Sequence, residues 1–265
     1  METKGMETER METKSAKPIV IAGLCVLESE AVVMTTAERI AGVARHLGTE
    51  IIFKASFDKA NRTSLHSYRG VGIERGVEML AEVKRRYGLR ITTDIHEAWQ
   101  AARVADVVDI IQIPAFLCRQ TDLIVAASES GRIVNIKKAQ FLSGMDMRHP
   151  YQKALESGAK EVWLTERGNA YGYNDLVVDL RNIADMHTFA PTVIMDCTHS
   201  LQRPGAGNGI TTGRGELIAP MALAAKAFGA DGYFFELHPT PHEALCDRDN
   251  TLALDKFEET IIPLM

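Results

Sequence analysis

The sequence has no apolar run that approaches the roughly 18 residues of a membrane-spanning helix. It also has no apolar segment near its start of the kind that forms a secretory signal peptide. We therefore expect a cytoplasmic protein that has no membrane partner.

Cysteines are few, and no two of them form a CxxC pair. Widely spaced cysteines fit a reducing compartment, in which a cysteine is free, reactive or a metal ligand. We expect no disulfide. A buried cysteine is most often a packed apolar side chain, and we assign Cys118, Cys197 and Cys246 to this class. Cys25 remains a candidate ligand.

The chain also lacks an excess of basic charge. Its 30 Lys and Arg residues against 35 Asp and Glu give a net charge of −5, which argues against a surface that wraps nucleic acid or binds an anionic membrane. GxSxG, Walker A and helix-opening GxGxxG motifs are missing too. Esterase-type hydrolases, P-loop NTPases and dinucleotide-binding enzymes therefore have no support.

What the sequence does contain is an alternation of short apolar runs and longer amphipathic segments. Eight runs alternating with helical patterns favour a single-domain α/β fold, the (β/α)₈ TIM barrel, over residues 18–265. The predicted strands are 19–22, 50–54, 90–93, 108–113, 133–136, 161–164, 192–195 and 232–235. Predicted helices include 36–46, 72–87, 176–186, 216–228 and one from residue 255.

The segment 1–17 repeats Met-Glu-Thr and has no apolar periodicity, so we expect a disordered or artefactual tail. The Gly-rich segment 203–215 follows the seventh predicted strand. It fits either a mobile lid or a plain flexible connection.

Polar side chains follow each predicted strand, at the end where barrel enzymes hold their active sites. Seven of them are cationic, and their convergence predicts a ligand with several phosphate or carboxylate charges. Any one of these side chains could equally extend to solvent or pair with a neighbouring acid, but this alternative explains the whole set poorly. The seven are Lys54, Lys59, Arg62, Arg119, Lys137, Lys138 and Arg167.

A second group of strand-end residues has metal-ligand chemistry. Cys25, His199, Glu236 and Asp247 follow the first, seventh and eighth predicted strands, which are neighbours in a closed barrel. Thiolate, imidazole and carboxylate donors suit Fe²⁺, Zn²⁺, Mn²⁺ or Co²⁺ better than Mg²⁺ or Ca²⁺. No local motif supports this set, and a packed Cys25 is the alternative. For His66, His96 and His238, structural and ligand-binding roles both stay open.

Seven segments resemble a known family. They are FKASFDKANRTS (53–64), TTDIHE (92–97), QIPAFLCRQTDL (112–123), NIKKAQF (135–141), LTERGNAYGYNDLVVD (164–179), DCTHS (196–200) and ELHPTPHEALCD (236–247). They are similar to the 3-deoxy-D-manno-octulosonate 8-phosphate synthases, also called 2-dehydro-3-deoxyphosphooctonate aldolases. The resemblance spans residues 18–257 and implies condensation of phosphoenolpyruvate with D-arabinose 5-phosphate and water in lipopolysaccharide precursor biosynthesis. It also implies a homotetramer of TIM barrels.

A related family, the 3-deoxy-D-arabino-heptulosonate 7-phosphate synthases, uses erythrose 4-phosphate as acceptor and is the first alternative. The loop KANRTS (59–64) is similar to the KANRSS pattern of the eight-carbon enzymes rather than to a KPRTS-type sequence. The second alternative is a non-catalytic sugar-phosphate binding protein.

The resemblance implies a role for each matched residue. Those matched to the phosphoenolpyruvate site are Ser56, Lys59, Gln112, Lys137 and Arg167. Those matched to the arabinose 5-phosphate site are Lys54, Asn61, Arg62, Thr63 and, from a neighbouring subunit, Arg119. The expected catalytic residues are Lys59, Asn61, Asp94, His199 and Asp247.

Cys25, with His199, Glu236 and Asp247, also implies the metal-dependent branch of the family, because the metal-independent branch has Asn in place of the cysteine. The chain departs from the family pattern at Leu24, where Pro is usual, at Ala139 and Gly144, and in the segment TTGRGEL (211–217). These departures put metal affinity and turnover in doubt rather than the fold.

Overall fold

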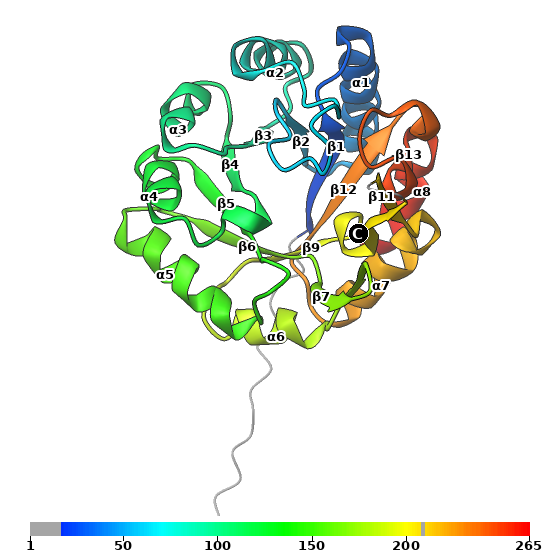
Figure 1. Ribbon diagram of the computed structural model, residues 1–265. Helices are drawn as coiled ribbons and strands as arrows, with labels where there is room; N and C mark the ends of the chain where they lie inside the picture. Colours follow the sequence, from blue (N-terminus) through cyan, green and yellow to red (C-terminus); the bar gives the residue numbers. More distant parts are fainter. Residues whose placement is uncertain (1–16, 208–209) are drawn as a thin grey trace, which may run out of the picture.

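The computed structural model describes residues 17–207 and 210–265, and in it eight parallel strands close into a barrel (Figure 1). The strands follow one another round the barrel in chain order, and β1 pairs with β12 to close it. They are β1 (Ile19–Val26), β2 (Ile51–Ser56), β3 (Ile91–Asp94), β4 (Ile110–Ile113), β5 (Ile133–Lys137), β6 (Val162–Glu166), β9 (Val193–Asp196) and β12 (Gly232–His238). The predicted (β/α)₈ barrel is confirmed.

Helices surround the barrel, one after each of its strands (Figure 1). They are α1 (Glu30–Leu47), α2 (Ile73–Tyr87), α3 (Ala98–Ala105), α4 (Thr121–Glu129), α5 (Arg148–Glu156), α6 (Arg181–His187), α7 (Ile218–Ala227) and α8 (Phe257–Ile261). The first shows how sequence sets these bounds. The Ser29 side chain accepts a hydrogen bond from the Val32 N–H at the start of α1, and Gly48 adopts the left-handed conformation that ends it.

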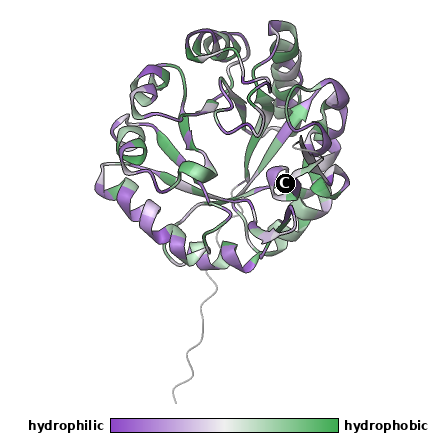
Figure 2. Ribbon diagram, in the orientation of Figure 1, coloured by the Kyte–Doolittle hydropathy of each residue, from purple (hydrophilic) through white to green (hydrophobic). Residues whose placement is uncertain are grey.

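Two sets of apolar side chains form the core. Those that point outward from the strands pack against the helices, while a separate cluster fills the barrel interior. The interior cluster is Ile21, Ile52, Ile110, Trp163, Ile194 and Phe234. Figure 2 shows apolar residues concentrated on the strands and hydrophilic residues on the outer helices.

The interior cluster also explains where polar side chains point. Because alternate residues of a strand face the same side, the residue two positions after each interior apolar side chain faces inward as well. This rule places Lys54, Gln112, Asp196 and Glu236 above the apolar layer, at the carboxyl ends of their strands. A polar site therefore lies directly on an apolar floor.

Two short hairpins and a two-residue strand complete the sheets. β7 (Asn169–Gly172) pairs with β8 (Asp175–Val177), β10 (Gln202–Gly207) pairs with β11 (Ile210–Gly213), and β13 (Leu252–Ala253) pairs in parallel with the end of β12. The 3₁₀ helices are η1 (Ala115–Leu117), η2 (Met145–Met147), η3 (His199–Leu201), η4 (Gly215–Leu217), η5 (Pro241–Glu243), η6 (Arg248–Asn250), η7 (Leu254–Lys256) and η8 (Ile262–Leu264).

These hairpins correct two expectations. The predicted helix 176–186 is wrong in its first part, because a turn at Tyr173 and Asn174, both at positive φ, pairs β8 with β7 before α6 begins. The segment 203–215 is largely an antiparallel hairpin rather than an irregular loop. Its residues 208–209 lie outside the described residues, as does the predicted tail except for Lys17.

Within the described ranges, no helix combines the length and apolar character needed to cross a membrane.

The interior cluster gives a stability prediction. Ile110 is fully buried in it, so we expect Ile110→Ala to lower the free energy of unfolding by about 2–5 kcal/mol through lost burial and a residual cavity. Leu65→Ala is the control, because that side chain is 92% exposed and its loss should change stability by less than about 0.5 kcal/mol. Urea denaturation measures both, and equal effects of the two substitutions would contradict the assignment of Ile110 to the core.

Candidate active site

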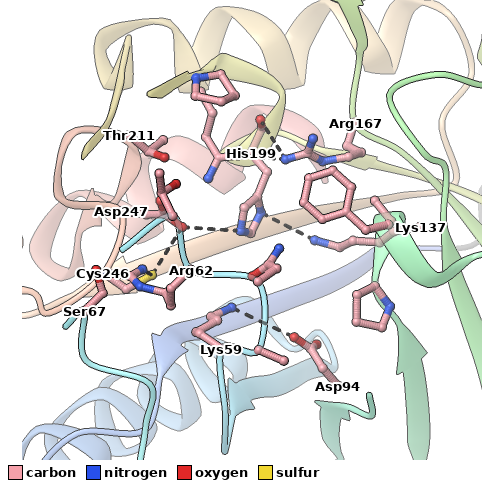
Figure 3. Close-up of a pocket in the computed structure, with 18 of the residues that line it drawn as sticks. Lys59, Arg62, Ser67, Asp94, Lys137, Arg167, His199, Thr211, Cys246 and Asp247 are labelled. Atoms are coloured by element: carbon pink, nitrogen blue, oxygen red, sulfur yellow. Dashed lines mark hydrogen bonds and ion pairs between the residues drawn. The ribbon is translucent and has the colours of Figure 1, made fainter. Parts of the chain in front are cut away.

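A pocket of about 1030 Å³ opens at the carboxyl ends of the barrel strands. Five of the seven predicted cations line it, and they come from β2, the following loop, β5 and the end of β6 (Figure 3). These five are Lys54, Lys59, Arg62, Lys137 and Arg167. The pocket is therefore suited to an anionic ligand.

The other two cations lie elsewhere. Lys138 follows Lys137 directly and points to the opposite face of the strand, since successive side chains alternate. It is fully buried and its Nζ lies 3.4 Å from Glu166 Oε1 and donates to Gly168 O. The prediction that Lys138 joins the barrel mouth is wrong. Arg119 is exposed after η1 and is not among the described residues that line the pocket.

An ion pair between Lys54 and Glu236 crosses the pocket floor. Lys54 Nζ lies 2.8 Å from Glu236 Oε1, and each side chain is only 1% exposed. The same ammonium donates to the carbonyl oxygens of Cys25 and Leu24 at 3.0 and 3.3 Å. Lys54 thus fixes both the end of β1 and the carboxylate of β12. Gly23 permits the close approach of the β1 and β2 backbones here, because a Cβ at this position would lie 2.0 Å from the backbone carbonyl oxygen of Lys54.

Asp94 organises the neighbouring edge of the floor. Its carboxylate accepts hydrogen bonds from Ser56 Oγ at 2.8 Å and from the Gln112 amide. Lys59 Nζ donates to Ser56 Oγ and lies 3.9 Å from both Asp94 and Glu236. Burial alone would raise the pKa of Asp94, but the charges of Lys54 and Lys59 outweigh it and hold that pKa well below its usual range.

Asp196 is fully buried beside the pocket and holds two functional side chains. Its Oδ2 accepts a hydrogen bond from Lys137 Nζ at 2.5 Å and lies 2.8 Å from His199 Nδ1. Burial disfavours a charged imidazole, but the carboxylates of Asp196 and Glu236 outweigh it and raise the pKa of His199 to about 10. Asp196 directly follows the predicted strand 192–195, but the sequence pattern alone gives it no role.

Arg167 is the cation with unused hydrogen-bonding capacity. Its Nη2 donates to Gln202 Oε1 at 2.7 Å, whereas its buried Nη1 has no partner among the described residues. Burial lowers the pKa of this guanidinium, although an arginine stays charged at physiological pH. An anion in the pocket would satisfy the free N–H groups.

The four predicted metal ligands meet as two overlapping groups. His199, Glu236 and Asp247 form one triad of donor atoms, and Cys25, Cys246 and Asp247 form the other, with all separations in each triad within 4.8 Å. Asp247 belongs to both and sits in the left-handed conformation at φ 48° and ψ 38°. The structure therefore brings the predicted ligands together and adds Cys246.

All four cysteines are free, and three of them are packed as expected. Cys118 and Cys197 lie in the large apolar core, and Cys246 is buried in a small cluster with Cys25 and Val26. Cys246 has polar contacts as well: its Sγ accepts a hydrogen bond from Arg62 Nη1 at 2.6 Å and lies beside Asp247. Its position next to Asp247, a predicted ligand, is the sequence feature that points to these contacts.

The remaining predicted residues fall into two groups. Asn61, Thr63 and His96 line the pocket, whereas His66 is not among the described residues that line it. His238 is buried against Glu28, with 3.5 Å between His238 Nε2 and the carboxylate.

The chain matches a known protein family over most of its length. Residues 5–263 match the sequence model of the DAHP synthetase I family. The chain belongs to this family.

Its relatives within the family share a name. A protein of Fusobacterium nucleatum subsp. nucleatum is 49% identical over 243 residues, covering 92% of this chain and 87% of the relative. A Desulfotalea psychrophila protein is 48% identical over 95% of this chain and 90% of its own length. One from Helicobacter pylori is 48% identical over 96% of each. All three are named 2-dehydro-3-deoxyphosphooctonate aldolase.

The raised pKa of His199 predicts a pH effect on the metal-free protein. His199 has a pKa of about 10 in the fold, against the ordinary histidine pKa of 6.5, so its protonation stabilises the fold fully below pH 6.5 and this contribution is lost as the pH rises through 10. We expect the melting temperature in chelator to fall more steeply between pH 7 and 10 for the wild type than for His199→Asn. The exposed His242→Asn is the control, and it should retain the wild-type slope. Identical slopes for wild type and His199→Asn would refute the shift.

Proposed function

We propose that the protein condenses phosphoenolpyruvate with D-arabinose 5-phosphate and water to give 3-deoxy-D-manno-octulosonate 8-phosphate and inorganic phosphate. The proposal places this reaction in lipopolysaccharide precursor biosynthesis. The observation that carries it is the strand-end pocket with five cationic side chains, in a chain whose relatives have the name of this aldolase. The shared name also disfavours erythrose 4-phosphate as the acceptor.

Phosphoenolpyruvate is proposed to lie over the floor between β3 and β6. Arg167 directly follows β6, and Lys137 ends the adjacent strand β5. They offer a forked donor and a point charge to the phosphate and carboxylate of this substrate. Lys59 completes the set, with Ser56 and Gln112 holding the Asp94 carboxylate in place beside it. Two anionic groups on one small substrate account for this density of positive charge.

Arabinose 5-phosphate is proposed to lie toward the loop after β2. Asn61, Arg62 and Thr63 line that side of the pocket, and Lys54 lies on the floor beneath. Asn61 offers both a donor and an acceptor for a sugar hydroxyl. We further propose a cytoplasmic homotetramer in which Arg119 of a neighbouring subunit reaches the sugar phosphate. A fully active monomer in sedimentation analysis would contradict the shared site.

The residues divide the chemistry between them. C3 of phosphoenolpyruvate forms a bond to the aldehyde carbon, and Lys59, a charged donor at the floor, is placed to protonate the aldehyde oxygen as it becomes a hydroxyl. Water adds at C2, and Asp247 is placed to accept the proton that this water loses. Arg167 and Lys137 stabilise the phosphate that leaves when the C2–O bond of the tetrahedral intermediate breaks, and the proton of the C2 hydroxyl passes to that phosphate as the ketone forms.

The donor set fits a divalent metal ion. Cys25, His199, Glu236 and Asp247 provide thiolate, imidazole and carboxylate donors, which suit Fe²⁺, Zn²⁺, Mn²⁺ or Co²⁺. The contact of His199 Nδ1 with Asp196 leaves Nε2 facing Glu236 at 3.2 Å, and such a carboxylate partner is typical of a metal-binding histidine. When bound, the ion would supply Lewis-acid polarisation of an oxygen.

Arg167 provides a test of substrate binding. We expect Arg167→Ala to lower kcat/KM for phosphate release by roughly 30-fold to several thousand-fold, because removing a buried charged contact costs about 2–5 kcal/mol. Arg75→Ala, on the exposed surface of α2, is the matched control and should retain wild-type activity. Wild-type kinetics in Arg167→Ala would contradict the proposed anion site.

Asp196 provides a test of metal dependence. Chelation should abolish phosphate release, and added Mn²⁺, Zn²⁺ or Fe²⁺ should restore it. Asp196→Asn removes the charge that orients His199, so we expect it to weaken metal binding by about 10- to 100-fold, measured by competition with a chromophoric chelator. Activity that is indifferent to chelation would overturn the metal proposal and leave the condensation standing.

A further inference from the structure

Cys246 is the member of the metal-donor groups that neither the sequence pattern nor the proposed four-ligand set includes. It is 3% exposed and shares a small buried cluster with Cys25 and Val26. Its Sγ lies 3.5 Å from Asp247 Oδ2, and Cys25 Sγ lies 3.4 Å from the same oxygen. Two sulfurs thus face one carboxylate oxygen from opposite ends of the chain.

These separations match a common coordination sphere. With metal–sulfur bonds of about 2.3 Å and metal–oxygen bonds of about 2.1 Å, sulfur and oxygen donors of a five-coordinate ion lie about 3.1 Å apart at an angle of 90° and about 3.8 Å apart at 120°. The sulfur–oxygen distances of 3.4 and 3.5 Å fall between these values. Asp247 also belongs to the triad with His199 and Glu236, so this carboxylate links the sulfur pair to the other two predicted ligands.

We propose that Cys246 is a fifth protein ligand and that the metal site of this protein holds two thiolates. This inference rests on the proposed metal dependence and deepens it. Cys25, Cys246 and Asp247 would form the sulfur-rich side of the site, with His199 and Glu236 on the other. Two thiolates favour thiophilic ions such as Zn²⁺ over Mn²⁺ and Mg²⁺, which prefer oxygen donors.

The surrounding charges suit such a set. Two thiolates and two carboxylates carry four negative charges, and a divalent ion with a neutral imidazole leaves an excess of two. Three cations adjoin these donors: Lys54 at 2.8 Å and Lys59 at 3.9 Å from Glu236, and Arg62 at 2.6 Å from Cys246 Sγ. Arg62 is therefore a positioning residue, because its N–H group fixes the direction of the sulfur.

Cobalt spectroscopy counts the thiolate ligands independently of activity. Ligand-to-metal charge transfer from thiolate to Co²⁺ absorbs in the near ultraviolet with an intensity that rises with the number of Co–S bonds. We expect Cys246→Ser and Cys25→Ser, loaded with one equivalent of Co²⁺, each to show about half of the wild-type intensity. Cys118→Ala, which removes a thiol from the apolar core, is the matched control and should leave the band unchanged.

The outcomes separate the two claims. Full wild-type intensity in Cys246→Ser, with the band lost in Cys25→Ser, would overturn the fifth ligand and leave the proposed metal site intact. No charge-transfer band in the wild type would overturn both. X-ray absorption of the Zn²⁺-loaded wild type gives a test that does not depend on the folding of a variant. We expect two sulfur neighbours of the zinc ion at about 2.3 Å, and a single sulfur neighbour would contradict the proposal.

Discussion

The buried ion pair between Lys54 and Glu236 is the interaction on which the rest of the site depends. It joins β2 to β12 across the barrel and, through the carbonyl oxygens of Leu24 and Cys25, fixes the end of β1. Each side chain is only 1% exposed, so removing one partner would leave a buried charge without its counter-ion, at a cost of about 3–5 kcal/mol. The pair therefore sets both the position of the Cys25 thiol and the direction in which Glu236 faces His199.

From this pair, charges alternate across the pocket floor. Glu236 and Asp94 flank Lys59, and Asp196 holds Lys137 and His199. Each acid is ionised because its cationic neighbours outweigh the penalty of burial. The floor is thus rigid before any substrate arrives, and Arg167 keeps free donor capacity for an anion. Such preorganisation is what stabilisation of a phosphate-bearing transition state requires.

The sequence predicted the barrel because buried parallel strands appear as short β-branched runs, and every run found a partner on both sides. Strand periodicity also explains why Lys137 faces into the barrel and Lys138 away from it. The prediction placed both lysines at the barrel mouth because they are neighbours in the sequence. The sequence pattern did not indicate the β7–β8 and β10–β11 hairpins or the contacts of Asp196 and Cys246. Two of the contacts involved, Arg214 with Asp175 and Arg62 with Cys246, join distant segments, which a single sequence does not encode locally.

The most direct measurement of the central claim is a competition between acceptors. Phosphoenolpyruvate is supplied with equal concentrations of arabinose 5-phosphate and erythrose 4-phosphate, and the products are identified by mass spectrometry alongside phosphate release. The account predicts an eight-carbon 3-deoxy sugar phosphate as the main product, formed in equal amount to the phosphate released. A seven-carbon product alone, or no product with either acceptor, would contradict it.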